Sequence, residues 1–246
     1  MRLHPRARSV IKSMLAASAG IGGTITHVAT REPVAALTFD DGPNPEATPR
    51  LLDLLAAYGA RATFFVVGEA AVRHPGIVAR AVSEGHAVAN HSWDHPSFPL
   101  LPSRERRRQI ERCAAALGPR GERLFRPPWG HQSLGSRWDA ARARHAVVAW
   151  SAMAEDWLDD PADVLAARVR PRLAPGAIVL LHDALYRTIA ERYRDRAPML
   201  AAVETLLREF AARLRFVTVP ELLRAGRPRK WHWYKPADRA WLARQI

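Results

Sequence analysis

The chain has 246 residues, 48% of them hydrophobic, so it is long enough to bury the core of one α/β barrel or of two small domains. Its formal net charge of +13 suits nucleic acid, an anionic membrane surface or an acidic substrate. The arginines that produce this charge are spread over the whole chain and accompany no nucleic-acid recognition motif, so compositional bias is the simpler explanation and no nucleic-acid partner is expected.

Residues 1–33 are expected to form an N-terminal extension. A basic opening is followed by a weakly apolar, glycine-broken stretch, which partly resembles a secretory signal but is poor in leucine and lacks a clear cleavage site. No run reaches the roughly 18 apolar residues that a spanning helix needs, and Cys113, the single cysteine, excludes an internal disulfide. We therefore expect a cytoplasmic protein, with export as the alternative.

Apolar segments rich in β-branched and aromatic residues recur along the chain and predict strands. They span residues 34–40, 61–67, 86–90, 122–126, 146–151, 176–182 and 215–219. Segments with helical spacing lie between them, for example residues 48–59, 75–85, 103–118 and 161–173. Seven alternations of strand and helix imply parallel strands joined by crossover helices in one barrel-like domain.

Polar residues follow five of these strands where each one ends. They are the pair Asp40 and Asp41, "HSWDH" at 91–95, "RPPWG" at 126–130, "EDW" at 155–157 and His182. Because functional residues of such barrels gather at the carboxyl ends of the strands, we expect these segments to meet in one cavity.

Two details of these segments favour a metal site. Neighbouring side chains of a strand point to opposite faces, so Asp40 and Asp41 share a cavity only if the backbone leaves the extended form there, and Gly42-Pro43 is expected to cause this. The histidines of "HSWDH" are four residues apart on one turn, close enough to share a metal ion.

Taken in order, the motifs "TFDDGP", "HSWDH", "RPPWG", "EDW" and "LLH" resemble those of the polysaccharide deacetylases of carbohydrate esterase family 4, the group with the NodB homology domain, which includes chitooligosaccharide deacetylases. The resemblance covers residues 34–224. It implies a single domain with a distorted (β/α)7 barrel and metal-dependent removal of acetyl groups from N-acetylated amino sugars.

The resemblance also implies a role for each motif. Asp41, His91 and His95 would hold one divalent metal ion, for which zinc is expected and cobalt, nickel or manganese are alternatives. Asp40 would be the general base that takes a proton from the attacking water, and Arg126 would pair with it.

The remaining roles concern the oxyanion, the leaving group and the acetyl methyl. The backbone N–H of Trp129 would stabilise the oxyanion, and His182 would protonate the departing amine. Asp156 would raise the pKa of that histidine, while Leu180 and Trp157 would form the walls for the acetyl methyl group.

This chain departs from the family pattern at two motifs. Family members commonly have tyrosine at the position of Trp129, and Met153 and Ala154 replace residues that are often polar or acidic. Neither change removes a ligand or an acid–base group, so we expect them to affect the choice of substrate.

Residues 225–246 are expected to form a basic, aromatic C-terminal tail that includes Trp231, Trp233, Tyr234 and Trp241. Such a mixture suits stacking on a sugar or peripheral contact with an anionic membrane. An arm packed on the barrel is the alternative, because tryptophans usually bury most of their surface.

Three functions agree with these residues. The first is hydrolysis of the acetamido group of an amino sugar, whether in an oligosaccharide, a polysaccharide or a lipid-linked sugar. The second uses the same site on a linear or cyclic non-sugar amide. The third is a catalytically silent glycan-binding module, which would need neither the base Asp40 nor the acid His182.

Overall fold

A computed structural model describes residues 23–188, 194–232 and 235–237. A curled parallel sheet has the strand order β6-β5-β4-β3-β2-β8-β7, and β9 pairs with the start of β2. The strands are β2 (Val34–Asp40), β3 (Ala62–Val66), β4 (Ala87–Asn90), β5 (Gly121–Phe125), β6 (Ala146–Val147), β7 (Ala152–Met153), β8 (Ile178–His182) and β9 (Arg215–Phe216). This is the expected distorted (β/α)7 arrangement, a half-barrel in which no pairing joins β6 to β7 within the described ranges.

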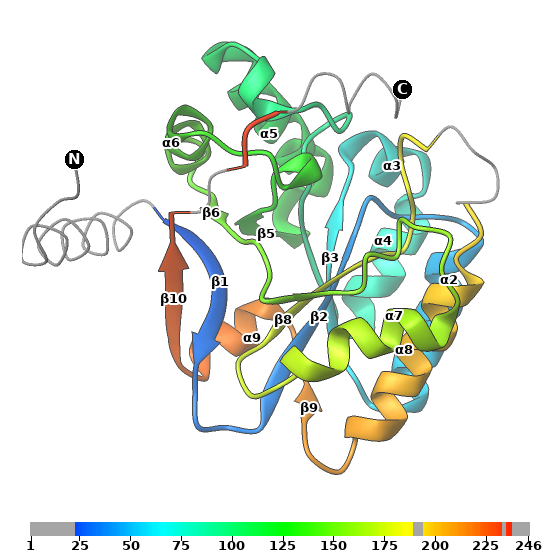
Figure 1. The fold of residues 1–246 in the computed structure, drawn as a ribbon. Helices are drawn as coiled ribbons and strands as arrows, with labels where there is room; N and C mark the ends of the chain where they lie inside the picture. Colours follow the sequence, from blue (N-terminus) through cyan, green and yellow to red (C-terminus); the bar gives the residue numbers. More distant parts are fainter. Residues whose placement is uncertain (1–22, 189–193, 233–234, 238–246) are drawn as a thin grey trace, which may run out of the picture.

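Most helices cover the outer face of the sheet (Figure 1), whereas the last one, residues 219–224, packs in the apolar cluster of the inner face. The helices are α2 (Ala47–Ala57), α3 (Gly68–Arg73), α4 (Pro75–Ser83), α5 (Ser103–Leu117), α6 (Leu134–Arg142), α7 (Ala162–Val169), α8 (Ala197–Phe210) and α9 (Val219–Arg224). Gly59, Gly85 and Gly118 follow three of them with positive φ, as helix-terminating glycines do. None of the helices in the described ranges combines the length and apolarity needed to cross a bilayer.

Alternation along β2 separates the core from the inside of the half-barrel. Leu37 and Phe39 belong to the main apolar cluster, which includes buried residues of α2, α7 and α8. Residues of the other parity, Ala36, Thr38 and Asp40, occupy the opposite face. Strand β8 is in register with β2, so that Thr38 pairs with Leu180 and Asp40 with His182. The carboxyl ends of the strands therefore form one polar edge.

The fold differs from the predicted elements in two regions. The strand predicted at 146–151 is shorter in the structure: β6 ends at Val147, because Val148 and Ala149 turn to pair with Ile25, and β7 begins only at Ala152. A separate antiparallel ribbon pairs β1 (Thr24–Ala29), in the predicted N-terminal extension, with β10 (Arg227–Trp231), in the predicted tail. Figure 1 shows this ribbon on the side of the molecule away from α2 and α8.

Several sequence predictions fall outside the described residues. These are the signal-like segment, of which residues 1–22 are not described, and the tail residues Trp233, Tyr234 and Trp241. The predicted cellular location and domain boundaries stay predictions.

Cys113 gives a test of the core. Its side chain is fully buried, and burial raises the pKa of its thiol to about 12. Only the thiolate reacts readily with disulfide reagents. We predict that a chromogenic disulfide labels Cys113 at least about 100-fold more slowly in the native protein than in denaturant, because labelling requires unfolding. Labelling at the denatured rate would show that this part of the core is open.

Candidate active site

Three buried side chains converge where β2 and β4 end. Asp41 follows β2, His91 follows β4 and His95 lies four residues further on, and one ligand atom from each lies within 4.8 Å of the others. The Asp41 Oδ1 atom is 3.3 Å from His91 Nε2 and 3.1 Å from His95 Nε2. The structure thus brings together the three residues that the sequence proposes as metal ligands.

The backbone reaches this arrangement by leaving the regular conformations at two of these residues. Asp41 has a φ of 75° and precedes the cis Gly42-Pro43 peptide, so the chain turns at Asp41 itself, one residue before the predicted break. Ser92 and His95 also have positive φ, and residues 91–95 form a loop after β4. Non-glycine residues in this region cost on the order of 1–3 kcal/mol each, and such costs concentrate at functional sites.

The protonation of the site favours a bound cation. The Nδ1 atom of His91 lies 2.7 Å from the carbonyl oxygen of Arg126, which can only accept, so Nδ1 carries a proton and Nε2 faces Asp41. Burial lowers the pKa of His95 by more than Asp41 raises it. Burial raises the pKa of Asp41, but attraction to His95 and contacts with His91 outweigh it and hold the pKa well below its ordinary value.

These observations test whether the triad suits a metal ion. An anionic oxygen and two imidazoles meet in a buried space, and Asp41 Oδ1 has no hydrogen-bond donor among the described residues. Two histidine nitrogens and one carboxylate oxygen form a ligand set that zinc and related divalent ions accept. The backbone N–H of Tyr186 donates to Asp41 Oδ2 at 3.1 Å and orients the carboxylate. The residues therefore fit a divalent cation.

Asp40 lies beside the triad and is held by Arg126. The fully buried guanidinium donates from Nη1 to Asp40 Oδ1 and to Thr38 Oγ1, each at 2.7 Å. Its Nη2 donates to the carbonyl oxygen of Ala149 at 3.0 Å. The second oxygen of Asp40 is 3.8 Å from His91 Nε2, so it faces the triad. Asp40 thus has one oxygen fixed and one available to accept a proton.

His182 stands on the neighbouring strand with its own carboxylate. Asp156 Oδ1 lies 2.9 Å from His182 Nδ1, and Asp156 Oδ2 accepts the backbone N–H of His182 at 2.8 Å. Burial lowers the pKa of His182, but the charges of Asp156, Asp41 and Asp40 raise it by more, so that the pKa is about 9. The ring is therefore an imidazolium near pH 7 in the metal-free protein and can donate a proton from Nε2.

The predicted substrate-contacting residues lie around these groups. The Trp129 ring is 4.6 Å from the His95 ring, and the Trp157 ring meets His182 edge-on at 5.5 Å. Leu180 is buried on the face of β8 that carries His182. Trp129 has φ 62° and ψ 3°, which places its peptide in a left-handed conformation.

The sequence did not reveal two residues that support the site. Arg196 is buried just before α8 and donates to Asp156 Oδ2 at 2.5 Å, to the Asp156 carbonyl oxygen at 2.9 Å and to the His182 carbonyl oxygen at 3.2 Å. Tyr186 contributes its backbone N–H, which any residue except proline carries. Neither residue belongs to a motif, and the only sequence signal is that both follow the strand ending in His182.

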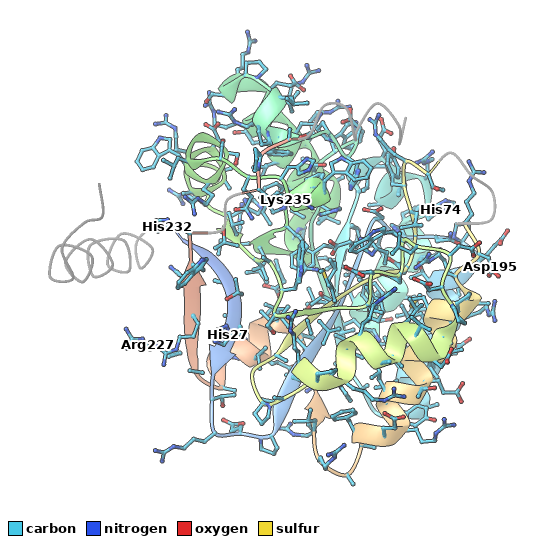
Figure 2. The ribbon with its side chains drawn as sticks, in the orientation of Figure 1. His27, His74, Asp195, Arg227, His232 and Lys235 are labelled. Atoms are coloured by element: carbon cyan, nitrogen blue, oxygen red, sulfur yellow. The ribbon has the colours of Figure 1, made fainter. Side chains whose placement is uncertain are left out.

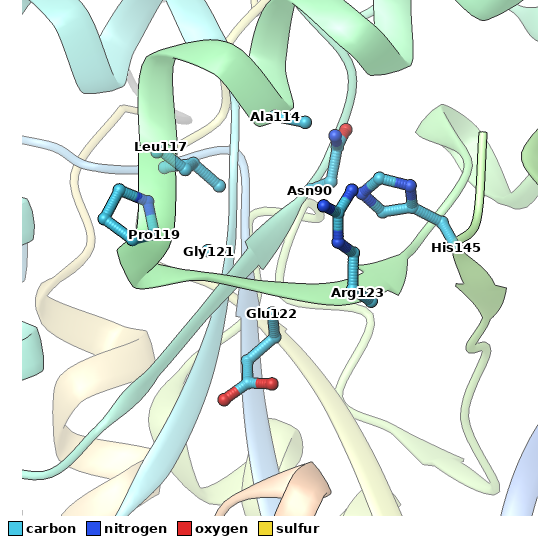
Figure 3. Close-up of a pocket in the computed structure, with 9 residues that line it drawn as sticks. Asn90, Ala114, Leu117, Pro119, Gly121, Glu122, Arg123 and His145 are labelled. Carbon is cyan, nitrogen blue, oxygen red and sulfur yellow. The ribbon is translucent and has the colours of Figure 1, made fainter.

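A separate cavity of about 160 Å³ lies at the end of α5 (Figure 3). The residues that line it are Asn90, Ala114, Leu117, Gly118, Pro119, Gly121, Glu122, Arg123 and His145. None of the predicted site residues lines this cavity, so it is not part of the site.

Comparison with known proteins agrees with this geometry. The "Polysaccharide deacetylase" family model matches residues 27–148. A peptidoglycan-N-acetylglucosamine deacetylase of Bacillus cereus is 33% identical over 198 residues, which cover 79% of this chain and 70% of that protein. A chitooligosaccharide deacetylase of Sinorhizobium fredii is 38% identical over 164 residues, 65% of this chain and 76% of that protein.

A solved structure is also similar. The crystal structure of the Bc1960 peptidoglycan N-acetylglucosamine deacetylase superposes with a TM-score of 0.76 at 28% identity, covering 88% of this chain and all of that one. The chain therefore belongs to the polysaccharide deacetylase family.

Asp156→Asn tests the electrostatics of the His182 pair. We predict that it lowers the pKa of His182 from about 9 towards its ordinary value, because the largest charge that opposes burial is removed and only those of Asp41 and Asp40 remain. The folded-state pKa is raised, so the stabilisation is fully present below about pH 6.5 and is lost as pH rises towards 9. Nuclear magnetic resonance titration of the ring in metal-free protein measures the shift, and an unchanged pKa would contradict the assignment.

Proposed function

We propose that the protein is a metal-dependent carbohydrate N-deacetylase, which hydrolyses the acetamido group of an N-acetylated amino sugar to acetate and a free amine. One observation carries the proposal: a buried Asp41–His91–His95 triad lies between a carboxylate fixed by arginine and an imidazolium fixed by carboxylate. A glycan-binding module would need neither the carboxylate that acts as a base nor the imidazolium that acts as an acid. The B. cereus and S. fredii relatives are named as deacetylases of such sugars.

We propose zinc as the resident ion, with cobalt, nickel or manganese able to replace it, since all accept nitrogen and oxygen ligands. A divalent ion held by Asp41, His91 and His95 supplies Lewis acidity towards the amide carbonyl and lowers the pKa of water towards neutrality.

Residues of the chain itself carry out the proton transfers of the proposed reaction. Asp40 accepts a proton from water through the oxygen that Arg126 leaves free, as the water oxygen bonds to the carbonyl carbon. The Trp129 N–H donates to the oxyanion that forms. His182 gives its proton to the nitrogen as the carbon–nitrogen bond breaks, so acetic acid and a neutral amine leave. The acid then ionises to acetate, and the site is restored when Asp40 releases its proton and His182 takes one up.

Substrate walls come from apolar side chains beside these groups. Leu180 and Trp157 flank His182 and suit the acetyl methyl group. Trp129, in place of the common tyrosine, offers a larger ring beside His95 to a neighbouring sugar.

The polymer or oligomer accepted is the finer part of the proposal. Mass spectrometry of N-acetylated chitooligosaccharides, peptidoglycan fragments, and linear and cyclic non-sugar amides, each incubated with zinc-loaded protein, decides it. Loss of an acetyl group from a sugar supports the proposal. Hydrolysis of the non-sugar amides alone would favour the second function, and binding without hydrolysis the third.

Membrane contact through the tail has less support than a sugar substrate. Within the described part of the tail, Arg227–Trp231 form a strand paired with β1, which agrees better with the packed arm. Trp231 is nevertheless 65% exposed, so its ring is available to a large ligand.

The variant Asp40→Asn tests whether Asp40 acts as the general base or as a metal ligand. The amide is nearly isosteric but cannot take the water's proton, so we predict that kcat falls about 10²- to 10⁴-fold, or about 3–5 kcal/mol, while one metal ion per chain remains. Activity on chitooligosaccharides and metal content by mass spectrometry measure the two effects. Equal loss of metal and activity would mean that Asp40 is itself a ligand.

A further inference from the structure

The tail beyond β10 reaches the segment that carries Trp129. The backbone N–H of Gln132 donates to the carbonyl oxygen of Lys235 at 2.8 Å, which forms an antiparallel bridge between the two residues. The Lys235 Nζ atom donates to the carbonyl oxygen of Trp129 at 3.0 Å. Figure 2 shows Lys235 over the body of the molecule, whereas His27 and Arg227 lie along the ribbon at its side.

The N-terminal strand holds the same segment from inside. The Thr24 hydroxyl donates to Gln132 Oε1 at 2.7 Å, and both side chains are almost completely buried. The ribbon also joins the sheet through the bridge between Ile25 and Val148. Because β1 and β10 pair with each other, residues from the two terminal segments contact one loop.

That loop has a reason to need support. Trp129 adopts a left-handed backbone conformation that non-glycine residues rarely occupy, and such residues persist only when their surroundings fix them. Lys235 bonds the peptide on one side of Trp129, and the N–H proposed as the oxyanion donor belongs to the peptide on its other side. Rotation about the backbone of Trp129 would move both, so the contact limits the direction of that N–H.

We propose that the paired terminal strands are a brace for the Trp129 loop and that Lys235 is a positioning residue for oxyanion stabilisation. The inference rests on the proposed function, and nothing in the five sequence motifs contains it.

The kinetic test uses Lys235→Met with Lys230→Met as its matched control, since the control removes the same charge from β10 next to the loop. We expect Lys235→Met to lower kcat about three- to tenfold with KM unchanged, because a misplaced donor weakens transition-state binding alone. Lys235→Arg keeps a cationic donor and should stay within about twofold of the native kcat. Equal kcat values for the two methionine variants would overturn the proposal.

A second variant tests the buried end of the brace. Thr24→Val keeps the shape of the side chain and removes its bond to Gln132. We expect the same selective fall in kcat, and an unchanged kcat in a folded protein would contradict a brace that extends to β1.

Tryptophan fluorescence provides a readout that does not depend on activity. Lys235→Met should change the emission spectrum of the native protein and leave that of the Trp129→Phe background unchanged, because the ammonium lies against the Trp129 peptide. If the native enzyme hydrolyses no N-acetylated sugar, the proposed function fails, whereas this comparison still decides whether Lys235 acts on Trp129. Equal changes in both backgrounds would overturn the contact.

Discussion

The negative charge of Asp41 is the constraint around which the site is arranged. A buried carboxylate is costly unless it is paired, and here the nearest groups are two imidazoles. The carbonyl of Arg126 holds Nδ1 of His91, and the Nε2 atoms of both imidazoles face the carboxylate. A divalent cation would be bound by all three residues at once, in agreement with the convergence of the strand ends and their left-handed residues there.

The carboxylate of the base and the carboxylate that holds the acid His182 are bound in the same way. Asp40 and Asp156 are both buried, and each is bound by a buried arginine, Arg126 or Arg196. In each pair the arginine takes one oxygen of the carboxylate and leaves the other for chemistry: towards the triad for Asp40 and towards His182 for Asp156. Each arginine thus brings a buried positive charge to its carboxylate, and the two pairs stand beside the candidate metal ligands.

Sequence reasoning reached the sheet and the motif residues because both depend on local patterns. Buried parallel strands such as β2 and β8 are continuous apolar runs, and their carboxyl ends must share an edge, so the ten predicted site residues could be placed at one cavity. It could not reach β1 and β10, whose short polar strands are stabilised by pairing across some 200 residues of chain. Arg196 and Lys235 were missed for a related reason: each acts through backbone carbonyls, which leave no pattern in the side-chain sequence.

The most direct test of this account is anomalous X-ray scattering at the zinc edge from crystals grown with zinc. We predict one strong peak within bonding distance of Asp41, His91 Nε2 and His95 Nε2, and its loss in His95→Ala. A triad without a peak in crystals that bind zinc elsewhere would contradict the central claim that the buried charge of Asp41 is there to hold a metal ion.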